Sequence, residues 1–278
     1  MTFSNHRVLN IQKHQFVFPL VLFGVIWALT GACKGPDRSD ESNVRDIVFL
    51  ITDDPDNYEA DKTIPVFARQ LEDNFQFTTH VLMGEGPREA YRFPDLSILR
   101  EADLLVVFCR RLALPEAQMK QIKQYIKQGK PVMGIRTANH AFSVRGDTIP
   151  PGYTDWWDFV PDVLGSSNEG YGPVEPGTNI SVVSSQASHP ILQGIEESYW
   201  HSIGNVYKVG NSLDDDATVL LRGTVESEDL DEPVAWLWEN QYGGQVFYSS
   251  VGHPADFENS DNVKILNQAI AWLTQNTN

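Results

Sequence analysis

Continuous apolar runs recur along the first half of the chain, and each ends abruptly in polar residues. Residues 46–52, 102–109 and 132–135 are such runs. A run without polar alternation is typical of a strand that is buried on both faces of a parallel sheet. Within the third run, Gly134 lacks a side chain and therefore allows another segment to approach the backbone closely.

Segments with helical spacing lie between these runs. Apolar side chains fall on one face over residues 61–75, with Asp61 as the expected N-cap, and again over 115–129, where Pro115 suits the first turn. Residues 75–83 alternate between apolar and polar as a strand does. This order of strands and helices predicts an α/β fold with a doubly wound parallel sheet.

The second half of the chain predicts shorter strands. They cover residues 179–184, 217–221, 234–238 and 245–250. Gly243 and Gly244 separate the last two strands, which is a hairpin signal. A terminal amphipathic helix follows, with Ser260 or Asp261 as its expected N-cap.

Residues 143–178 follow neither pattern and form a long connection rich in aromatic side chains. A connection of this length is usually functional or disordered, and the aromatic content argues against disorder. We expect the segment to pack over the mouth of the sheet. Flat aromatic rings stack on sugar faces, so Trp156, Trp157 and Tyr171 are candidate saccharide contacts. The alternative is that these aromatics only hold the segment in place.

Polar side chains follow the predicted strands at their carboxyl ends. They are Asp53, Asp54, Arg136, Asn139, His140 and His253. Ligands of open parallel sheets bind at that edge. We therefore expect Arg136, His140 and His253 to line one cleft, with an imidazole as general acid or base and the guanidinium as an anchor for an anion or for sugar hydroxyls. The alternatives are packed or solvated histidines and an acidic loop that serves turn chemistry.

The N-terminus has the pattern of an export signal. An apolar run over residues 16–30 is short for a membrane span, and small residues and then Cys33 follow it, as in bacterial lipoprotein signals. Leu29 lies four residues before Cys33 instead of the usual three. We expect residues 1–32 to be a lipoprotein-type signal peptide, Cys33 to be lipidated, and residues 33–44 to be a polar tether. A plain cleaved signal and an uncleaved anchor are the alternatives.

The net charge bears on nucleic-acid binding, and the cysteine content bears on disulfide formation. The formal net charge is -16, from 37 acidic against 21 basic residues, and no basic patch stands out, so nucleic-acid binding is not expected. Cys33 and Cys109 are the two cysteines. If Cys33 is lipidated, no disulfide can form within the chain, and we expect Cys109 to be a buried, inert thiol.

Four motifs in order carry a resemblance to a known family. They are Pro-Val-Met-Gly-Ile-Arg at 131–136, His-Pro-Ile-Leu-Gln-Gly-Ile at 189–195, Pro-Val-Ala-Trp at 233–236, and Gly-Gly-Gln-Val-Phe-Tyr-Ser-Ser-Val-Gly-His at 243–253. Together they resemble the trehalose-utilisation (ThuA-like) family over roughly residues 45–275. The resemblance implies a fold like that of class I glutamine amidotransferases, which is a flavodoxin-like sheet with added strands.

The chain departs from both patterns at the turn after residues 132–135. Amidotransferases resemble it in fold but place a nucleophilic cysteine there, and many ThuA-like members place a histidine, whereas this chain has Arg136. Ala255 also stands where the amidotransferase His-Pro-Glu has its glutamate. A guanidinium stays protonated and is not a nucleophile, so a Cys-His-Glu triad is excluded at this turn.

Two hypotheses for function follow from the resemblance. The first is an exported, lipid-anchored hydrolase or lyase of the bacterial envelope that acts on trehalose-like or oxidised (keto) glycosides. Its general acid or base would be His253 or His140, and Arg136, Asp53, Asp54 and Asn139 would contact the substrate. A divalent metal is the only cofactor considered, held by these histidines and aspartates, although no paired ligand motif supports it. The second hypothesis is a non-catalytic module that binds a sugar or a partner. The sequence leaves the oligomeric state open.

Overall fold

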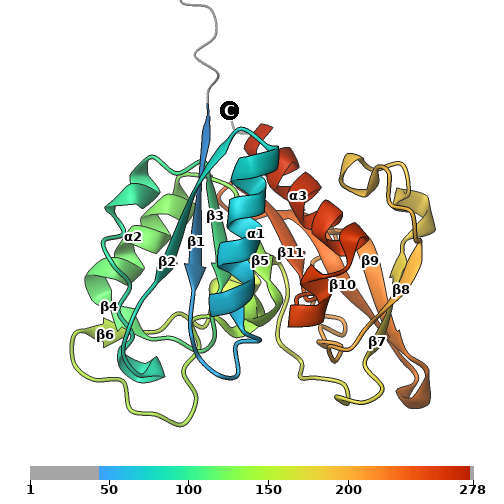
Figure 1. The fold of residues 1–278 in the computed structure, drawn as a ribbon. Helices are drawn as coiled ribbons and strands as arrows, with labels where there is room; N and C mark the ends of the chain where they lie inside the picture. The colour runs from blue at the N-terminus through green and yellow to red at the C-terminus, as the bar shows by residue number, and fades with distance from the viewer. Residues whose placement is uncertain (1–43, 276–278) are drawn as a thin grey trace, which may run out of the picture. The chain divides into compact units, whose positions relative to one another are not determined.

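The computed structural model describes residues 44–275, so the predicted signal peptide, Cys33 and nearly all of the tether lie outside the described range. One nine-stranded sheet has the order β2-β1-β3-β5-β11-β10-β9-β7-β8 (Figure 1). Its strands are β1 (Arg45–Ile51), β2 (Phe77–Met83), β3 (Leu104–Phe108), β5 (Val132–Ile135), β7 (Thr178–Val182), β8 (Tyr199–Ser202), β9 (Thr218–Val225), β10 (Leu230–Glu239) and β11 (Gln245–Ser249). A separate two-stranded pair joins β4 (Leu114–Pro115) to β6 (Tyr153–Thr154).

The sheet is parallel in one half and antiparallel in the other. Strands β2, β1, β3, β5 and β11 pair in parallel, and β10, β9, β7 and β8 continue the sheet in antiparallel pairs. The predicted mostly parallel sheet with added strands is therefore confirmed, and so is the hairpin of β10 and β11 around Gly243 and Gly244. Because β11 runs parallel to β5, both strands end at the same edge of the sheet.

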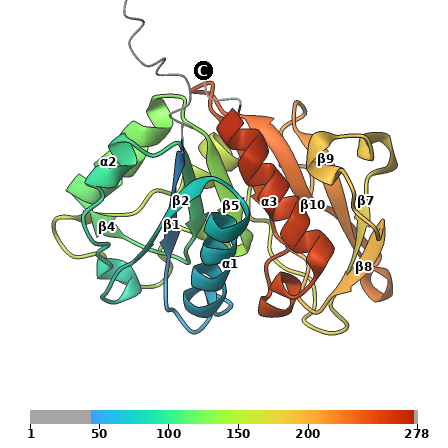
Figure 2. The same ribbon diagram turned by 45° about the horizontal axis from the view of Figure 1, so that its top comes forward.

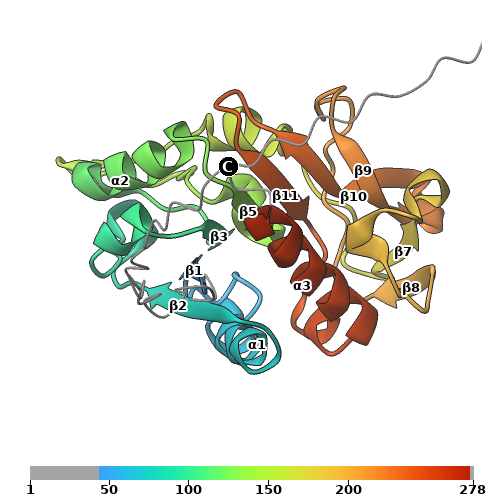
Figure 3. The ribbon, with the colours of Figure 1, turned by 90° about the horizontal axis from the view of Figure 1, so that it is seen from above.

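Helices cover both faces of the parallel half. Helices α1 (Ala60–Asn74) and α3 (Ser260–Gln275) pack on one face, and α2 (Glu116–Lys127) packs on the other (Figures 2 and 3). Alternate residues of β1 enter the two cores, Phe49 on the α1 side and Leu50 on the α2 side. Burial on both faces explains why these strands are continuous apolar runs. None of the helices within 44–275 is long and apolar enough to cross a membrane.

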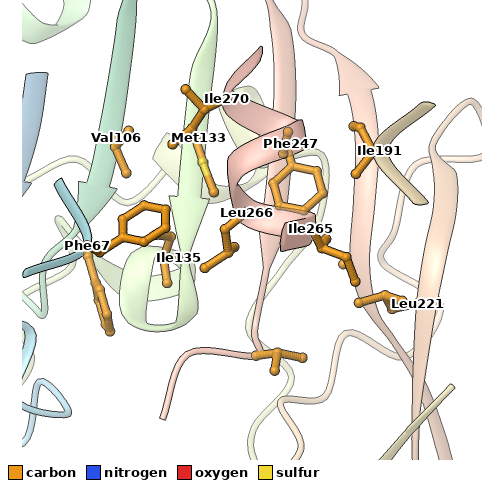
Figure 4. Close-up of a cluster of buried hydrophobic side chains, with 14 of the residues drawn as sticks. Phe67, Val106, Met133, Ile135, Ile191, Leu221, Phe247, Ile265, Leu266 and Ile270 are labelled. Atoms are coloured by element: carbon orange, nitrogen blue, oxygen red, sulfur yellow. The ribbon is translucent and has the colours of Figure 1, made fainter. Parts of the chain in front are cut away.

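The core beneath α1 and α3 joins the two halves of the sheet. Figure 4 shows Phe67 of α1 and Leu266 of α3 beside strand residues such as Ile135 and Phe247. Each fully buried side chain of this size contributes about 1.5–3 kcal/mol relative to an exposed one. This packing fixes the directions of β5 and β11, whose ends carry Arg136 and His253.

Helix ends differ from the sequence predictions in detail. Asp61 lies inside the first turn of α1, and the residue before that helix is Glu59, with a φ of 49°. Asn259, rather than Ser260 or Asp261, caps α3, because its Oδ1 accepts from the backbone N–H of Asn262 at 2.9 Å. Side-chain capping needs the residue just outside the helix, and the sequence pattern placed these boundaries one or two residues late.

The long connection 143–178 packs through its aromatic side chains, as expected from its composition. Trp156 is 7% exposed, and its ring centroid lies 5.4 Å from that of Phe159, which also packs edge-on against Phe142. Trp236 of β10 donates from its indole nitrogen to the Leu164 carbonyl at 2.8 Å. The segment therefore covers the sheet on the α2 side and then continues toward Tyr171 at the carboxyl edge.

Candidate functional site

A pocket of about 430 Å³ opens among residues that follow the carboxyl ends of β1, β3 and β5. That edge lies at the bottom of the sheet in Figure 1. The lining residues are Pro55, Asp56, Tyr58, Arg110, His140, Tyr171, Asn205 and Tyr207. This volume is within the usual range for small-molecule sites, roughly 300–1,000 Å³. Aromatic faces and hydrogen-bonding groups are combined in its wall.

Arg136 begins the turn that leaves β5 and has a left-handed backbone with a φ of 44°. Only neighbouring contacts hold a non-glycine residue in that conformation. The Tyr248 hydroxyl donates to the Arg136 carbonyl at 2.8 Å. A Cβ on Gly134 would lie 2.9 Å from the Tyr248 ring, which confirms the close approach predicted for that glycine. The strand therefore ends in a sharp elbow.

The Arg136 side chain lies beneath the pocket and is only 1% exposed. Its Nη1 donates to the Ser250 carbonyl at 2.8 Å and its Nη2 to Asn205 Oδ1 at 2.9 Å. The guanidinium carbon lies 3.9 Å from the Tyr58 ring centroid and 4.8 Å from that of Tyr207. The cation is thus enclosed between two rings of the pocket wall.

Gly204 provides the space for this guanidinium. A Cβ at position 204 would lie 2.9 Å from Arg136 Nη1, closer than real Cβ contacts allow. The segment after β8 therefore approaches Arg136 closely, and Asn205 and Tyr207 reach the pocket from that segment. Arg136 therefore connects the turn after β5 to the segment after β8.

Asn57 connects three strand ends below the pocket and is fully buried. Its Nδ2 donates to the carbonyls of Thr52 at 3.3 Å and Phe108 at 2.8 Å, at the ends of β1 and β3. Its Oδ1 accepts a short hydrogen bond from Thr137, in the turn after β5. A side-chain amide with both donors and its acceptor engaged fixes the geometry of this edge.

His140 lines the pocket and is 3% exposed. Its Nδ1 makes a short contact with Asn139 Oδ1 and lies 3.1 Å from Asn168 Nδ2 and 3.4 Å from the Tyr171 hydroxyl. Burial lowers the pKa of His140 well below its ordinary value, and nearby guanidiniums, with Arg111 first, lower it further. The imidazole is therefore neutral at neutral pH.

His253 contacts Tyr58 but is not among the residues that line the pocket. The two ring centroids are 5.9 Å apart in an edge-on contact, and the His253 Nδ1 accepts from the Ala255 backbone N–H at 3.3 Å. The backbone N–H of His253 donates to Asp256 Oδ2 at 2.8 Å. Burial, followed by the charge of Arg136, lowers the pKa of His253. Its catalytic role stays a prediction, since its ring caps the turn Pro254–Phe257.

Tyr58 combines an unusual backbone with an unusual electrostatic setting. Its φ is 51°, and its hydroxyl donates to Asn205 Oδ1 at 3.4 Å. Burial alone would raise the pKa of Tyr58, but the Arg136 guanidinium and a hydrogen bond with Tyr207 lower it below the ordinary value. The Tyr207 pKa is raised by burial. A phenol with a lowered pKa in the wall of a small-molecule pocket is suited to proton transfer.

The acidic loop after β1 is held by arginines. Asp54 accepts a bidentate pair from Arg88, whose Nη2 also reaches Asp56 at 2.9 Å. Burial would raise the pKa of Asp54, but hydrogen bonds from Arg88 and from the Asp56 backbone, together with the charges of Arg88 and Arg110, lower it below the ordinary value. Asp56 also lies 3.3 Å from Arg110 Nη1. Asp56 thus lines the pocket, whereas Asp54 positions the loop and Asp53 is exposed.

The remaining candidates lie away from the pocket wall. Trp156 belongs to the core, while Trp157 is 49% exposed and donates from Nε1 to Asp155 Oδ2 at 2.7 Å. Cys109 is fully buried at the end of β3, and burial raises its pKa, in agreement with an inert thiol. Within residues 44–275, no group of three His, Cys, Asp or Glu side chains converges as a metal site requires.

Several pocket residues were missed by sequence reasoning. Tyr58 and Arg110 follow β1 and β3 and were detectable by the same strand-end rule that selected Asp53 and His140. Asn205 and Tyr207 come from the connection after β8, and no local pattern in the sequence marks them. Only the antiparallel extension of the sheet brings that connection back to the carboxyl edge.

Comparisons with known proteins identify relatives of this fold. The family model ThuA, described as trehalose utilisation, matches residues 48–273. Among solved structures, a ThuA-like protein from Bacteroides uniformis ATCC 8492 has a TM-score of 0.60 and 14% identity, covering 85% of this chain and 94% of that one. A ThuA-like protein from Parabacteroides merdae ATCC 43184 also has a TM-score of 0.60 and 14% identity, with 83% and 90% covered. Agd3, described as a carbohydrate deacetylase, has a TM-score of 0.51 and 13% identity over 84% of this chain and 32% of that one. No curated protein sequence matches significantly.

Proposed function

This chain belongs to the trehalose-utilisation (ThuA) family, and on that premise we propose that it binds and transforms a saccharide in the tyrosine-lined pocket. The observation that carries the proposal is the composition of the pocket wall. The exposed ring of Tyr171 and the half-buried ring of Tyr58 offer surface to a sugar, and the side chains of Asp56, Asn205 and Arg110 offer hydrogen bonds to its hydroxyls. Trehalose and its oxidised keto form are the first substrates to test.

His140 is the proposed proton acceptor. It lines the pocket, its Nδ1 is engaged by Asn139 and Asn168, and no described residue bonds its Nε2. Because its pKa is lowered, the imidazole is neutral at neutral pH and is able to accept a proton from a substrate hydroxyl or from water. The contact of Asn139 Oδ1 with Nδ1 orients the ring.

A second candidate function is sugar binding without turnover. The observation in its favour is Arg136, which occupies the elbow where amidotransferases have a nucleophile and is enclosed by protein contacts. Both candidates predict binding at the same pocket. Product formation separates them, because only the enzyme converts the bound sugar.

Tyr171→Ala is expected to weaken saccharide binding about tenfold, because the substitution removes an exposed ring face from the pocket wall. Isothermal titration with trehalose, keto-trehalose and a panel of neutral sugars measures the affinity, and chromatography of the mixtures detects products. Tyr199→Ala is the matched control, since Tyr199 is 56% exposed on β8 and does not line the pocket. Equal affinities of the two variants, or no binding of any sugar, would contradict the proposal.

We also propose that the mature protein is exported and anchored to a bacterial membrane through a lipid on Cys33, a residue outside the described range. The support is the sequence pattern of an apolar run followed by small residues and a cysteine. Cys33→Ser is expected to leave the precursor unprocessed or to release the protein from the membrane fraction. Incorporation of labelled fatty acid into the Ser variant would contradict this assignment.

A further inference from the structure

The charges around the pocket do not balance. Asp54 and Asp56 are matched by Arg88 and Arg110, which contact them at ion-pair distance. Arg111 makes no ion pair with any described carboxylate. Arg136, beneath the pocket, makes none either. An uncompensated pair of guanidiniums is unexpected in a chain whose formal net charge is -16.

Both unmatched cations contact residues of the pocket wall. Arg111 follows Arg110, has a φ of 55°, and donates from Nη2 to the Tyr171 hydroxyl at 3.4 Å. Its Nη1 is buried and has no hydrogen-bond partner among the described residues, and the same holds for Nε of Arg136. Arginine donors are therefore among the unpartnered donors at the site.

The directions of two pKa shifts agree with a positive potential in the pocket. Burial lowers the pKa of Arg111, and repulsion by Arg145 and Arg110 adds to that effect. The same guanidiniums also lower the pKa of His140 after the effect of burial. A desolvated cation that has no carboxylate partner is costly, and arginine cannot lose its proton to avoid the cost.

We propose that the saccharide of this pocket carries a carboxylate, as in a uronic acid, and that Arg110 binds this carboxylate in the field of Arg111. This inference rests on the proposed function and specifies its substrate class. A carboxylate accepts charge-assisted hydrogen bonds from the fork of a guanidinium. Arg110 lines the pocket, and while its Nη1 lies 3.3 Å from Asp56, no described residue accepts from its Nη2. The sugar ring then lies against Tyr171 and Tyr58, and its hydroxyls reach Asn205.

The test compares matched pairs of sugars that differ only in the acid group. Full-length protein is titrated with glucose and glucuronate, galactose and galacturonate, and mannose and mannuronate, together with the 6-phosphates of the neutral sugars. At least one uronate is expected to bind about tenfold more tightly than its neutral partner. Raising sodium chloride from about 50 mM to about 300 mM is expected to weaken uronate binding and to leave neutral-sugar binding unchanged.

Substitutions identify the arginines that cause the preference for uronates over neutral sugars. Arg110→Gln and Arg111→Gln are each expected to remove most of the uronate preference, and Arg111→Lys is expected to retain part of it because the charge remains. Arg69→Gln, on the exposed side of α1, is the control and is expected to keep the preference. Melting curves identify any variant that fails to fold. In that case the salt dependence of uronate binding by the unmodified protein shows whether the carboxylate is bound through charge.

The outcomes separate this inference from the proposed function. Equal binding of uronates and neutral sugars would overturn the inference and leave the proposed function standing. If sugar phosphates bind and uronates do not, the inference that the acid group is a carboxylate is wrong. If neither kind of sugar binds, the proposed function itself is wrong.

Discussion

Asn57→Ala is expected to lower the free energy of unfolding by about 3 kcal/mol, because it leaves buried polar groups unpaired at three strand ends. The carbonyls of Thr52 and Phe108 would lose their donor, and the Thr137 hydroxyl would lose its acceptor. Each such group costs about 1–3 kcal/mol when it is buried without a partner. Urea unfolding monitored by circular dichroism measures the change.

Asn57→Ala is also expected to weaken ligand binding, because Asn57 precedes Tyr58 and fixes the loop that carries it into the pocket wall. Asn74→Ala is the matched control: Asn74 is exposed at the end of α1 and donates one hydrogen bond to the Gln70 carbonyl. Its loss is expected to change the stability by less than about 1 kcal/mol. Similar losses in both variants would show that Asn57 is not the connection that we infer.

The parallel half of the fold could be predicted from the sequence because a strand that is buried on both faces is a continuous apolar run. The residues of β1, β3 and β5 are apolar without alternation, and a helical face lies between each pair. By contrast, β8 has the pattern exposed-buried-exposed-buried over only four residues, and the sequence analysis did not predict it. A short half-exposed strand is determined by its neighbours in the sheet more than by its own residues.

The candidate site was likewise predicted from the sequence only in part. His140 was predicted because it directly follows a buried strand, and the structure places it in the pocket wall. Trp156 was selected for its residue type, and tertiary packing instead placed it against Phe159 in the core. Residue type indicates which chemistry is available. Only the pairing of β8 with β7, and of β7 with β9, brings the segment that carries Asn205 and Tyr207 to the pocket wall.

Arg136 shows why an elbow residue cannot be interpreted from the sequence motif alone. The strand end predicted a side chain that faces the ligand, and its guanidinium instead lies between Tyr58 and Tyr207 with 1% exposure. The physical reason is Gly204, whose missing side chain leaves room for the guanidinium beneath the wall. Arg136 therefore acts on the pocket through its charge and through the rings that it holds.

The stability of the protein is expected to decrease on acidification between about pH 7.5 and 5.5, with His140 as a main contributor. The folded state holds His140 neutral because burial and the surrounding guanidiniums lower its pKa well below the ordinary value. In the unfolded state the imidazole takes up a proton near pH 6.5. Unfolding therefore binds a proton at lower pH, and the slope from this one group approaches about 1.4 kcal/mol per pH unit.

His140→Gln removes this titration and is expected to flatten the dependence of unfolding free energy on pH by about that slope. The full-length protein and the variant are unfolded with urea at several values of pH within the window, where most carboxylates stay ionised in both states. His201→Gln, which replaces an exposed histidine of β8, is the control and is expected to keep the slope of the unmodified protein. Parallel curves for the unmodified protein and His140→Gln would mean that His140 is protonated to the same extent in the folded and unfolded states. The lowered pKa that we infer for His140 in the folded state would then be wrong.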